Sequence, residues 1–108
     1  MNITDIKRAN KKAGKFFFSP DTMKFFGSRI ESKVYEGRGG IYFVTSEQPP
    51  HGKRIFNVRR FQKETADIEF SKQAITTKEK ACKIAKGLAE CDLAVIGTFG
   101  ILGEEEAK

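Results

Sequence analysis

The side chains that most often carry catalysis are few in this 108-residue chain, and their spacing indicates no reaction. The single histidine, His51, lies in the proline-containing loop EQPPHGK, and nothing marks a serine or cysteine as its nucleophilic partner. Neighbouring carboxylates, such as Glu64 and Asp67, fall in turns or in the tail, where solvated acids are expected. We therefore expect no enzyme, although a small enzyme with a deep pocket near His51 or the acidic turns is an alternative.

The two cysteines, Cys82 and Cys91, do not have the spacing of a zinc site, which needs four soft ligands close in space. They are interpreted as small apolar fillers near one helix, and a disulfide between them is the alternative. We expect no metal and no cofactor.

The basic side chains indicate a function more clearly than the candidate catalytic residues do. Lysine and arginine outnumber aspartate and glutamate by 20 to 14, a net charge of +6. Residues 1–33 hold eight basic and three acidic side chains, a balance of +5. A basic front favours partners that carry phosphate or acidic groups. A charge that only keeps the protein soluble explains the total equally well.

The densest basic surface lies in a predicted helix over residues 3–13, with Thr4 as its cap and Gly14 at its end. Helical spacing gathers its four cations on the side opposite Ile3 and Ile6. The sharper hypothesis is a helix that contacts phosphates, and the alternative is an ordinary solvated face. The candidate residues are Lys7, Arg8, Lys11 and Lys12.

An antiparallel sheet is predicted from three runs rich in β-branched and aromatic residues, 41–46, 54–61 and 68–73, each bounded by turn residues. The middle run places Phe56 and Val58 on one face, which we expect helices to cover. The opposite face would then present polar side chains to solvent. Three residues of the middle run complete the predicted nucleic-acid-binding set: Arg54, Asn57 and Arg59.

Two glycine- or aromatic-rich stretches precede this sheet. The knot KFFFS and the segment SPDTMKFFG hold five phenylalanines, and Ser19, Pro20 and Gly27 mark the cap, first turn and end of a short helix. Residues 33–35 are expected to be extended. The following GRGG is interpreted as a hairpin turn, because a phosphate loop would end in GK[ST] and precede a helix.

A C-terminal amphipathic helix is predicted to begin at Thr76, in a capping box with Glu79, and to bury a stripe that contains Ala81, Ala85 and Leu88. The apolar residues 93–102 are too short to span a membrane and rich in glycine. We expect them to form a fourth strand, or a tail that covers the core or pairs two copies in a homodimer.

The elements together predict one α+β domain over residues 1–108. It has a three- to four-stranded antiparallel sheet, short N-terminal helices, and a C-terminal amphipathic helix packed on one face. Residues 103–108 are expected to fray. The chain opens without the apolar core of a signal peptide, so we expect a cytoplasmic protein with no membrane association.

Three resemblances bear on function. The three strands and the helix opening TTKEKA are similar to the arm-binding domains of phage integrases, which read DNA with arginines on a sheet face. The order helix, three strands, helix is also similar to double-stranded-RNA-binding domains. The segments FFFSPDTMKFFGSRI, VYEG, GGIYFVTSEQ and FNVRRF resemble a family of small uncharacterised proteins carried by bacteriophages, plasmids and integrative elements.

The last resemblance implies an accessory role for a mobile element in a bacterial cell and supplies no activity or site residues. We therefore expect a non-enzymatic protein that binds DNA or RNA through its basic helix and arginine-bearing sheet face. The alternative is a protein that binds and inhibits a host defence complex, of the anti-CRISPR kind.

Overall fold

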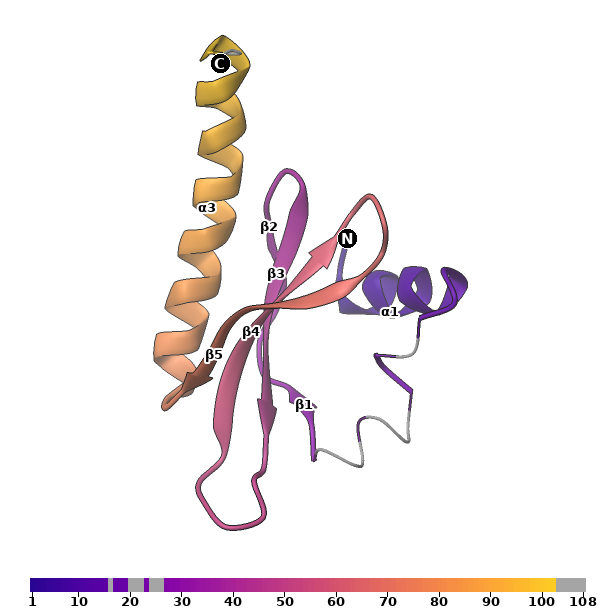
Figure 1. Cartoon of the computed structure of the whole chain (residues 1–108), viewed down its shortest axis with the longest axis vertical. Coiled ribbons are helices and arrows are strands. Elements are labelled where there is room, and N and C mark those ends of the chain that lie inside the picture. The colour runs from indigo at the N-terminus through magenta and orange to yellow at the C-terminus, as the bar shows by residue number, and fades with distance from the viewer. Residues whose placement is uncertain (16, 20–22, 24–26, 103–108) are drawn as a thin grey trace.

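A computed structural model describes residues 1–15, 17–19, 23 and 27–102, and it confirms the predicted α+β class (Figure 1). A five-stranded antiparallel sheet lies between an N-terminal helix and a long C-terminal helix. The elements are α1 (Ile3–Lys12), β1 (Arg29–Ile30), β2 (Tyr35–Glu36), β3 (Gly40–Glu47), β4 (Ile55–Gln62), β5 (Ile68–Ile75) and α3 (Lys78–Leu102).

The short helix predicted after Ser19 falls mostly outside the described residues, as do Phe16, Phe25 and Phe26. Its end is described. Met23 is helical, Gly27 adopts φ +56°, and the amide of Ser28 donates to the carbonyl of Met23 at 2.8 Å. This geometry confirms the predicted stop at Gly27, where the left-handed conformation costs glycine little.

The two shortest strands, β1 and β2, pair with the same edge of β3, one after the other. β1 pairs with β3 through Ile30 and Thr45, and β2 pairs with it through Tyr35 and Tyr42. Between them the hydroxyl of Ser32 accepts from the amide of Val44 at 2.9 Å, in place of a backbone carbonyl. Of the expected extended piece at 33–35, only Tyr35 lies in a strand, and the same edge of β3 also carries β1, which the sequence did not reveal.

The other half of the sheet is the predicted set of long strands. β3 pairs with β4 over its whole length, and β4 pairs with β5 with two register shifts. Ala74 lies at the shift between Phe56 and Val58 and has φ +56°, unusual for a residue with a side chain. β5 forms the outer edge, and its residues from Glu69 to Ala74 are exposed.

Helix α1 begins at Ile3, as predicted, but with a different cap. Its cap is Asn2 and not Thr4. The side chain of Asn2 accepts from the amide of Asp5 at 3.0 Å, and the carboxylate of Asp5 accepts from the amide of Asn2 at 3.0 Å. This reciprocal pair is a capping box. Gly14 follows the helix with φ +80°, as the expected stop.

The cap of helix α3 also differs from the predicted one, by one residue. The hydroxyl of Thr77, and not of Thr76, accepts from the amide of Lys80 at 3.2 Å. The helix then continues through Leu102, so the prediction of a fourth strand over 93–102 is wrong, and pairing of two copies through these residues stays a prediction. Extending an existing helix needs no new nucleus, so the cost of about 1 kcal/mol at Gly97 and Gly100 is tolerated. Figure 1 shows the helix running on past the sheet.

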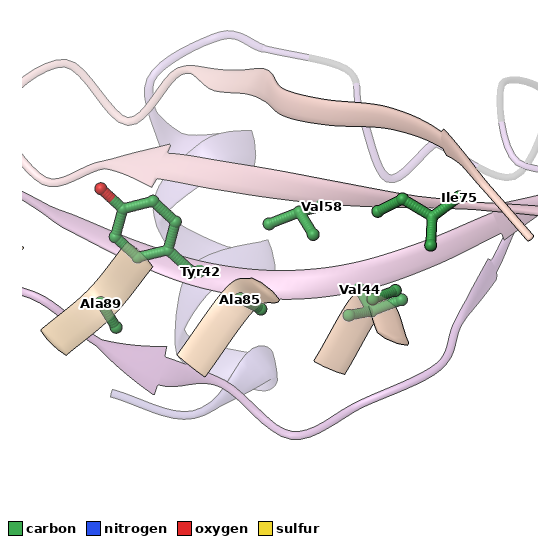
Figure 2. Packing of buried hydrophobic residues seen from close by; sticks show 7 residues of the cluster. Tyr42, Val44, Val58, Ile75, Ala85 and Ala89 are labelled. Atoms are coloured by element: carbon green, nitrogen blue, oxygen red, sulfur yellow. The ribbon is translucent and has the colours of Figure 1, made fainter. Parts of the chain in front are cut away.

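The first core lies between the sheet and α3, as predicted (Figure 2). Three alanines one helical turn apart, Ala81, Ala85 and Ala89, are buried against the sheet, with Cys82, Ile84 and Leu88 packed at the sides. Their small side chains let the helix approach closely. The strands supply Tyr42, Val44, Val58 and Ile75, with Phe56 half-buried beside them.

A second core fills the opposite face of the sheet, which was expected to be open. Ile6 of α1 is buried against Ile41, Phe43 and Phe61. The ring of Phe18 stacks on that of Phe43 with centroids 6.2 Å apart. Helices therefore cover both faces, since α1 and the segment that follows it fold back over the side that α3 leaves free.

Candidate nucleic-acid interface

The outer face of α1 is the exposed cationic surface that the sequence predicts. Lys7, Arg8, Lys11 and Lys12 are all exposed, whereas Ile6 and Asn10 on the inner face are buried. Arg8 pairs with Asp5 at 3.3 Å. Within the described part of the chain, no carboxylate pairs with the other three cations, so their charges are available to a ligand.

A buried amide fixes α1 on the sheet. Asn10 is only 2% exposed, and its Nδ2 donates to the carbonyl of Ala66 in the β4–β5 turn at 2.9 Å. Just beyond the helix, Lys15 Nζ pairs with Asp67 of the same turn at 2.8 Å. Hydrogen bonds that the side chains of Lys15 and Thr65 donate to its carboxylate lower the pKa of Asp67. The basic face is thus held by polar contacts at one end and by Ile6 in the middle.

The three predicted site residues in and just before β4 do not join this surface. Arg54 is half-buried, and its Nη1 donates to the carbonyl of Gly27 at 2.9 Å and to Ser46 Oγ at 2.8 Å. Asn57 is 2% exposed. Its Oδ1 accepts from the amide of Ala74 at 3.0 Å, and its Nδ2 has no hydrogen-bond partner among the described residues. Arg54 holds the segment before β1, and Asn57 holds the irregular end of β5.

Arg59 is buried, with 7% of its surface exposed, so the expectation that Asn57 and Arg59 face solvent is wrong. Its Nε donates to Thr45 Oγ1 at 3.1 Å, and its Nη2 pairs with Glu47 at 2.9 Å. Burial lowers the pKa of Arg59 and Glu47 acts against that shift, so the guanidinium stays protonated at neutral pH. Strand alternation placed Arg59 on the correct face, but it could not show that this face is covered.

Two aromatic rings enclose the guanidinium of Arg59. The ring centroid of Phe17 lies 4.8 Å from the guanidinium carbon, and that of Phe70 lies 3.8 Å from it. Phe17 is half-buried, whereas Phe70 keeps 45% of its surface exposed on the edge strand β5. Phe70 is not among the site residues that the sequence predicts. The only available signal was a phenylalanine that alternates with polar residues in an edge strand.

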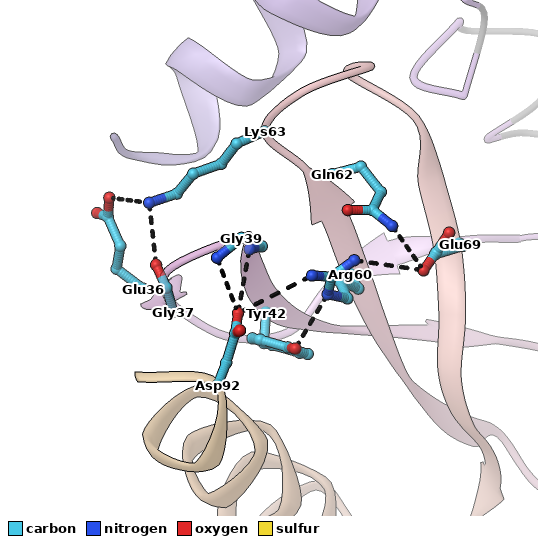
Figure 3. A network of polar contacts seen from close by, with 10 residues as sticks. Glu36, Gly37, Gly39, Tyr42, Arg60, Gln62, Lys63, Glu69 and Asp92 are labelled. Atoms are coloured by element: carbon cyan, nitrogen blue, oxygen red, sulfur yellow. Dashed lines mark hydrogen bonds and ion pairs between the residues drawn. The ribbon is translucent and has the colours of Figure 1, made fainter. Parts of the chain in front are cut away.

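The glycine-rich turn GRGG confirms the hairpin interpretation, joining β2 to β3 through a hydrogen bond from the amide of Gly37 to the carbonyl of Gly40. Its other amides nevertheless bind an anion (Figure 3). The carboxylate of Asp92 on α3 accepts from Gly39 at 3.2 Å and from Gly40 at 3.1 Å. Arg60 lies 3.9 Å from the same carboxylate. The turn is therefore occupied by a group of the protein itself.

The contacts of Figure 3 extend from this turn across the sheet. Arg60 Nε donates to the hydroxyl of Tyr42 at 3.0 Å, and its Nη1 lies 3.6 Å from Glu69. Lys63 donates to the carboxylate of Glu36 at 3.0 Å and to the carbonyl of Gly37 at 2.9 Å. The bond from Lys63 is the main cause of a lowered pKa at Glu36. The network ties α3, the β2–β3 hairpin and β4 together.

The remaining candidate catalytic and metal-binding residues do not form a common site in the described part of the chain. His51 is exposed in the β3–β4 loop, and both cysteines are free, so the alternative of a disulfide is wrong. Cys82 lies beside Tyr35, whose pKa is raised by burial first and by this thiol second. Among the described residues, no group of three histidine, cysteine, aspartate or glutamate side chains could hold a metal ion. No helix in the same part of the chain has the length and apolarity of a membrane span.

The fold and this surface define a small α+β protein with a helix on each face of an antiparallel sheet and an exposed basic face on the first helix. The chain belongs to a family of unknown function, DUF7447, whose model matches residues 2–83. The match includes α1, the whole sheet and the first turn of α3. No curated protein and no solved structure matches the chain.

Proposed function

We propose that the protein binds DNA or RNA through the outer face of α1. The observation that carries this proposal is the exposure of Lys7, Arg8, Lys11 and Lys12 on one side of a helix that is anchored on its other side. Three of these cations have no described carboxylate beside them, and contacts between such cations and phosphates supply most non-specific affinity for nucleic acid.

Arg54, just before β4, and Arg59, within it, have a positioning role in this proposal. Both arginines donate hydrogen bonds to groups of the protein itself. Arg54 donates to Gly27 and Ser46, and Arg59 donates to Thr45 and Glu47. They stabilise the covering segment after α1 and the strands beneath it. The ligand is therefore expected to contact the helix and the rim of the sheet, and not the centre of the sheet.

Salt dependence is the direct test. Lys11→Gln/Lys12→Gln removes two exposed charges for which no internal contact is described, and the matched control Lys80→Gln/Lys83→Gln removes two from the outer face of α3. In a titration of a labelled duplex, the slope of log affinity against log salt should fall by about 0.9 for each lysine that contacts a phosphate. The control should keep the wild-type slope.

Two outcomes contradict the proposal. One is a gel shift at low salt in which the wild-type protein retards neither DNA nor RNA. The other is an equal loss of affinity in both double variants, which would assign the binding to net charge and not to α1. A mobile-element accessory role is part of the proposal, and the genes that neighbour this one in its genome would test it.

A second candidate is a protein that inhibits a host defence complex. The observation that favours it is the part of α3 that runs past the sheet with the apolar sequence LAVIGTFGIL, where Leu93 is 50% exposed. Such a segment can pair with another protein or with a second copy of this chain. A pull-down from nuclease-treated host lysate distinguishes the candidates, because a stoichiometric protein partner survives nuclease only in this second case. Light scattering would show the homodimer.

A further inference from the structure

The exposed ring of Phe70 on the edge strand packs against a buried cation. The guanidinium of Arg59 lies against its inner face at 3.8 Å. Arg59 is itself held by hydrogen bonds to Thr45 and Glu47 and by its contact with the ring of Phe17. Because these contacts restrain the support behind the ring, the ring loses little freedom when a flat ligand stacks on its outer face, and such preorganisation favours binding.

The ring also lies on the same face of the sheet as α1. Phe43, Arg59 and Phe70 are direct partners across β3, β4 and β5, and Phe43 belongs to the core that contains Ile6. A continuous row of contacts leads from the ring to the helix. Arg59 touches the ring of Phe17, which meets Phe18 edge-on at 4.7 Å, and Lys7 Nζ lies 5.8 Å above Phe18. The exposed ring and the basic helix are the two ends of one row of packed side chains.

We infer that Phe70 is a stacking platform for an unpaired nucleobase, so that single-stranded nucleic acid is the ligand of this face. The inference rests on the proposed function, since α1 supplies the phosphate contacts. An aromatic platform beside a cationic track is the combination by which proteins bind single strands with little sequence preference. A duplex offers its phosphates to α1 but keeps its base faces stacked inside, out of reach of the ring.

The charges around the ring agree with this ligand. Glu69, the acidic neighbour in β5, pairs with Arg60, so its side chain lies on the α3 face. The carboxylate of Glu47 is paired with Arg59. The cation behind the ring draws on its π electrons, which lowers the repulsion between the outer face of the ring and the π electrons of a stacked base.

The experiment compares Phe70→Ala, Phe70→Leu and Phe70→Trp in the full chain, with a single-stranded oligonucleotide and a duplex of equal length as probes. Phe70→Ala and Phe70→Leu should each weaken single-strand binding about 5- to 150-fold, and leave duplex binding within about twofold of wild type. Since the chain has no tryptophan, Phe70→Trp introduces a single reporter. This variant should keep its affinity, and the single strand should quench its fluorescence.

The controls separate this inference from the proposed function. If Lys11→Gln/Lys12→Gln weakens binding of both probes while Phe70→Ala weakens neither, α1 binds nucleic acid and the platform is refuted. Full affinity in Phe70→Leu would show an ordinary apolar contact and also refute it. An unquenched tryptophan in a bound complex refutes it even if Phe70→Ala folds poorly. If wild-type protein binds neither probe, the proposed function itself fails, and a protein partner lost in Phe70→Ala would then assign the ring to protein binding.

Discussion

The two faces of the sheet are buried in different ways. The face under α3 is filled mainly by alanine, valine, isoleucine and tyrosine side chains, with Ser46 as its buried polar residue near the end of β3, and Ala81 and Ala85 are fully buried there. The face under α1 combines Ile41, Phe43 and Phe61 with buried polar side chains. Those are Asn10, Thr45, Asn57 and Arg59.

This difference indicates where stability and binding reside. Apolar burial is favourable without further conditions, whereas a buried amide or guanidinium must be fully paired to avoid a net cost. The α3 face thus supplies stability. The α1 face keeps polar groups that hold the two ends of the proposed interface, the basic helix and the ring of Phe70, in fixed positions.

The largest expected effect tests whether the α1 face is a true core. Phe43 is fully buried there, so Phe43→Ala should lower the free energy of unfolding by about 3–5 kcal/mol. Phe70→Ala, on the same face but 45% exposed, is the control and should cost much less. Urea denaturation measures both. A loss below about 1 kcal/mol for Phe43→Ala would mean that α1 does not cover the sheet in solution.

The next effect tests the buried charge. Arg59→Met should cost about 2–3 kcal/mol, because it leaves the carboxylate of Glu47 without its partner in a half-buried place. Adding Glu47→Gln should recover a large part of the loss, since no unpaired charge then remains. Chemical denaturation of the two single variants and the double variant gives the coupling. Strictly additive losses would contradict this account of the pair.

A smaller effect is expected where α3 meets the hairpin. Asp92→Ala removes the acceptor for the amides of Gly39 and Gly40 and one partner of Arg60, so it should cost about 1–2 kcal/mol. Asp92→Asn keeps one acceptor oxygen and should cost less. Hydrogen exchange should show faster exchange at both glycine amides in Asp92→Ala. Unchanged protection there would contradict the contact.

The smallest effect concerns the surface ion pairs. The pKa values of Glu36 and Asp67 are lowered, so the stability that these pairs contribute is present above about pH 4.5 and lost as the pH falls through the lowered values. Lys63→Met removes the main partner of Glu36 and should flatten the acid limb of stability, by less than about 1 kcal/mol. Thermal melts from pH 7 to pH 3 measure this. An unchanged acid limb would contradict it.

Local patterns were enough to predict the long strands and the α3 face. Turn residues bound β3, β4 and β5, and the stripe through Ala81 and Ala85 indicates the buried side of the helix. Both helix caps were misplaced by one or two residues, at Asn2 and Thr77, because adjacent residues there can all cap.

What the sequence could not show depends on distant contacts. Alternation assigns Arg59 to a face, but only the return of Phe17 over that face buries it. β1 has two residues and exists because β3 offers it an edge. The basic face of α1 was predictable, because its residues are local and exposed. The proposed role of the Phe70 ring was not predictable, because it depends on the contact between the ring and Arg59.

The irregular edge strand β5 affects how readily the protein aggregates at high concentration. An outer strand of eight residues offers free amides and carbonyls to any other strand and invites fibrous assembly. Three features of β5 hinder such pairing with another strand. They are its two register shifts, the left-handed backbone of Ala74 and the exposed charge of Lys72. A variant that straightened this edge would gain regular pairing and lose its protection against aggregation.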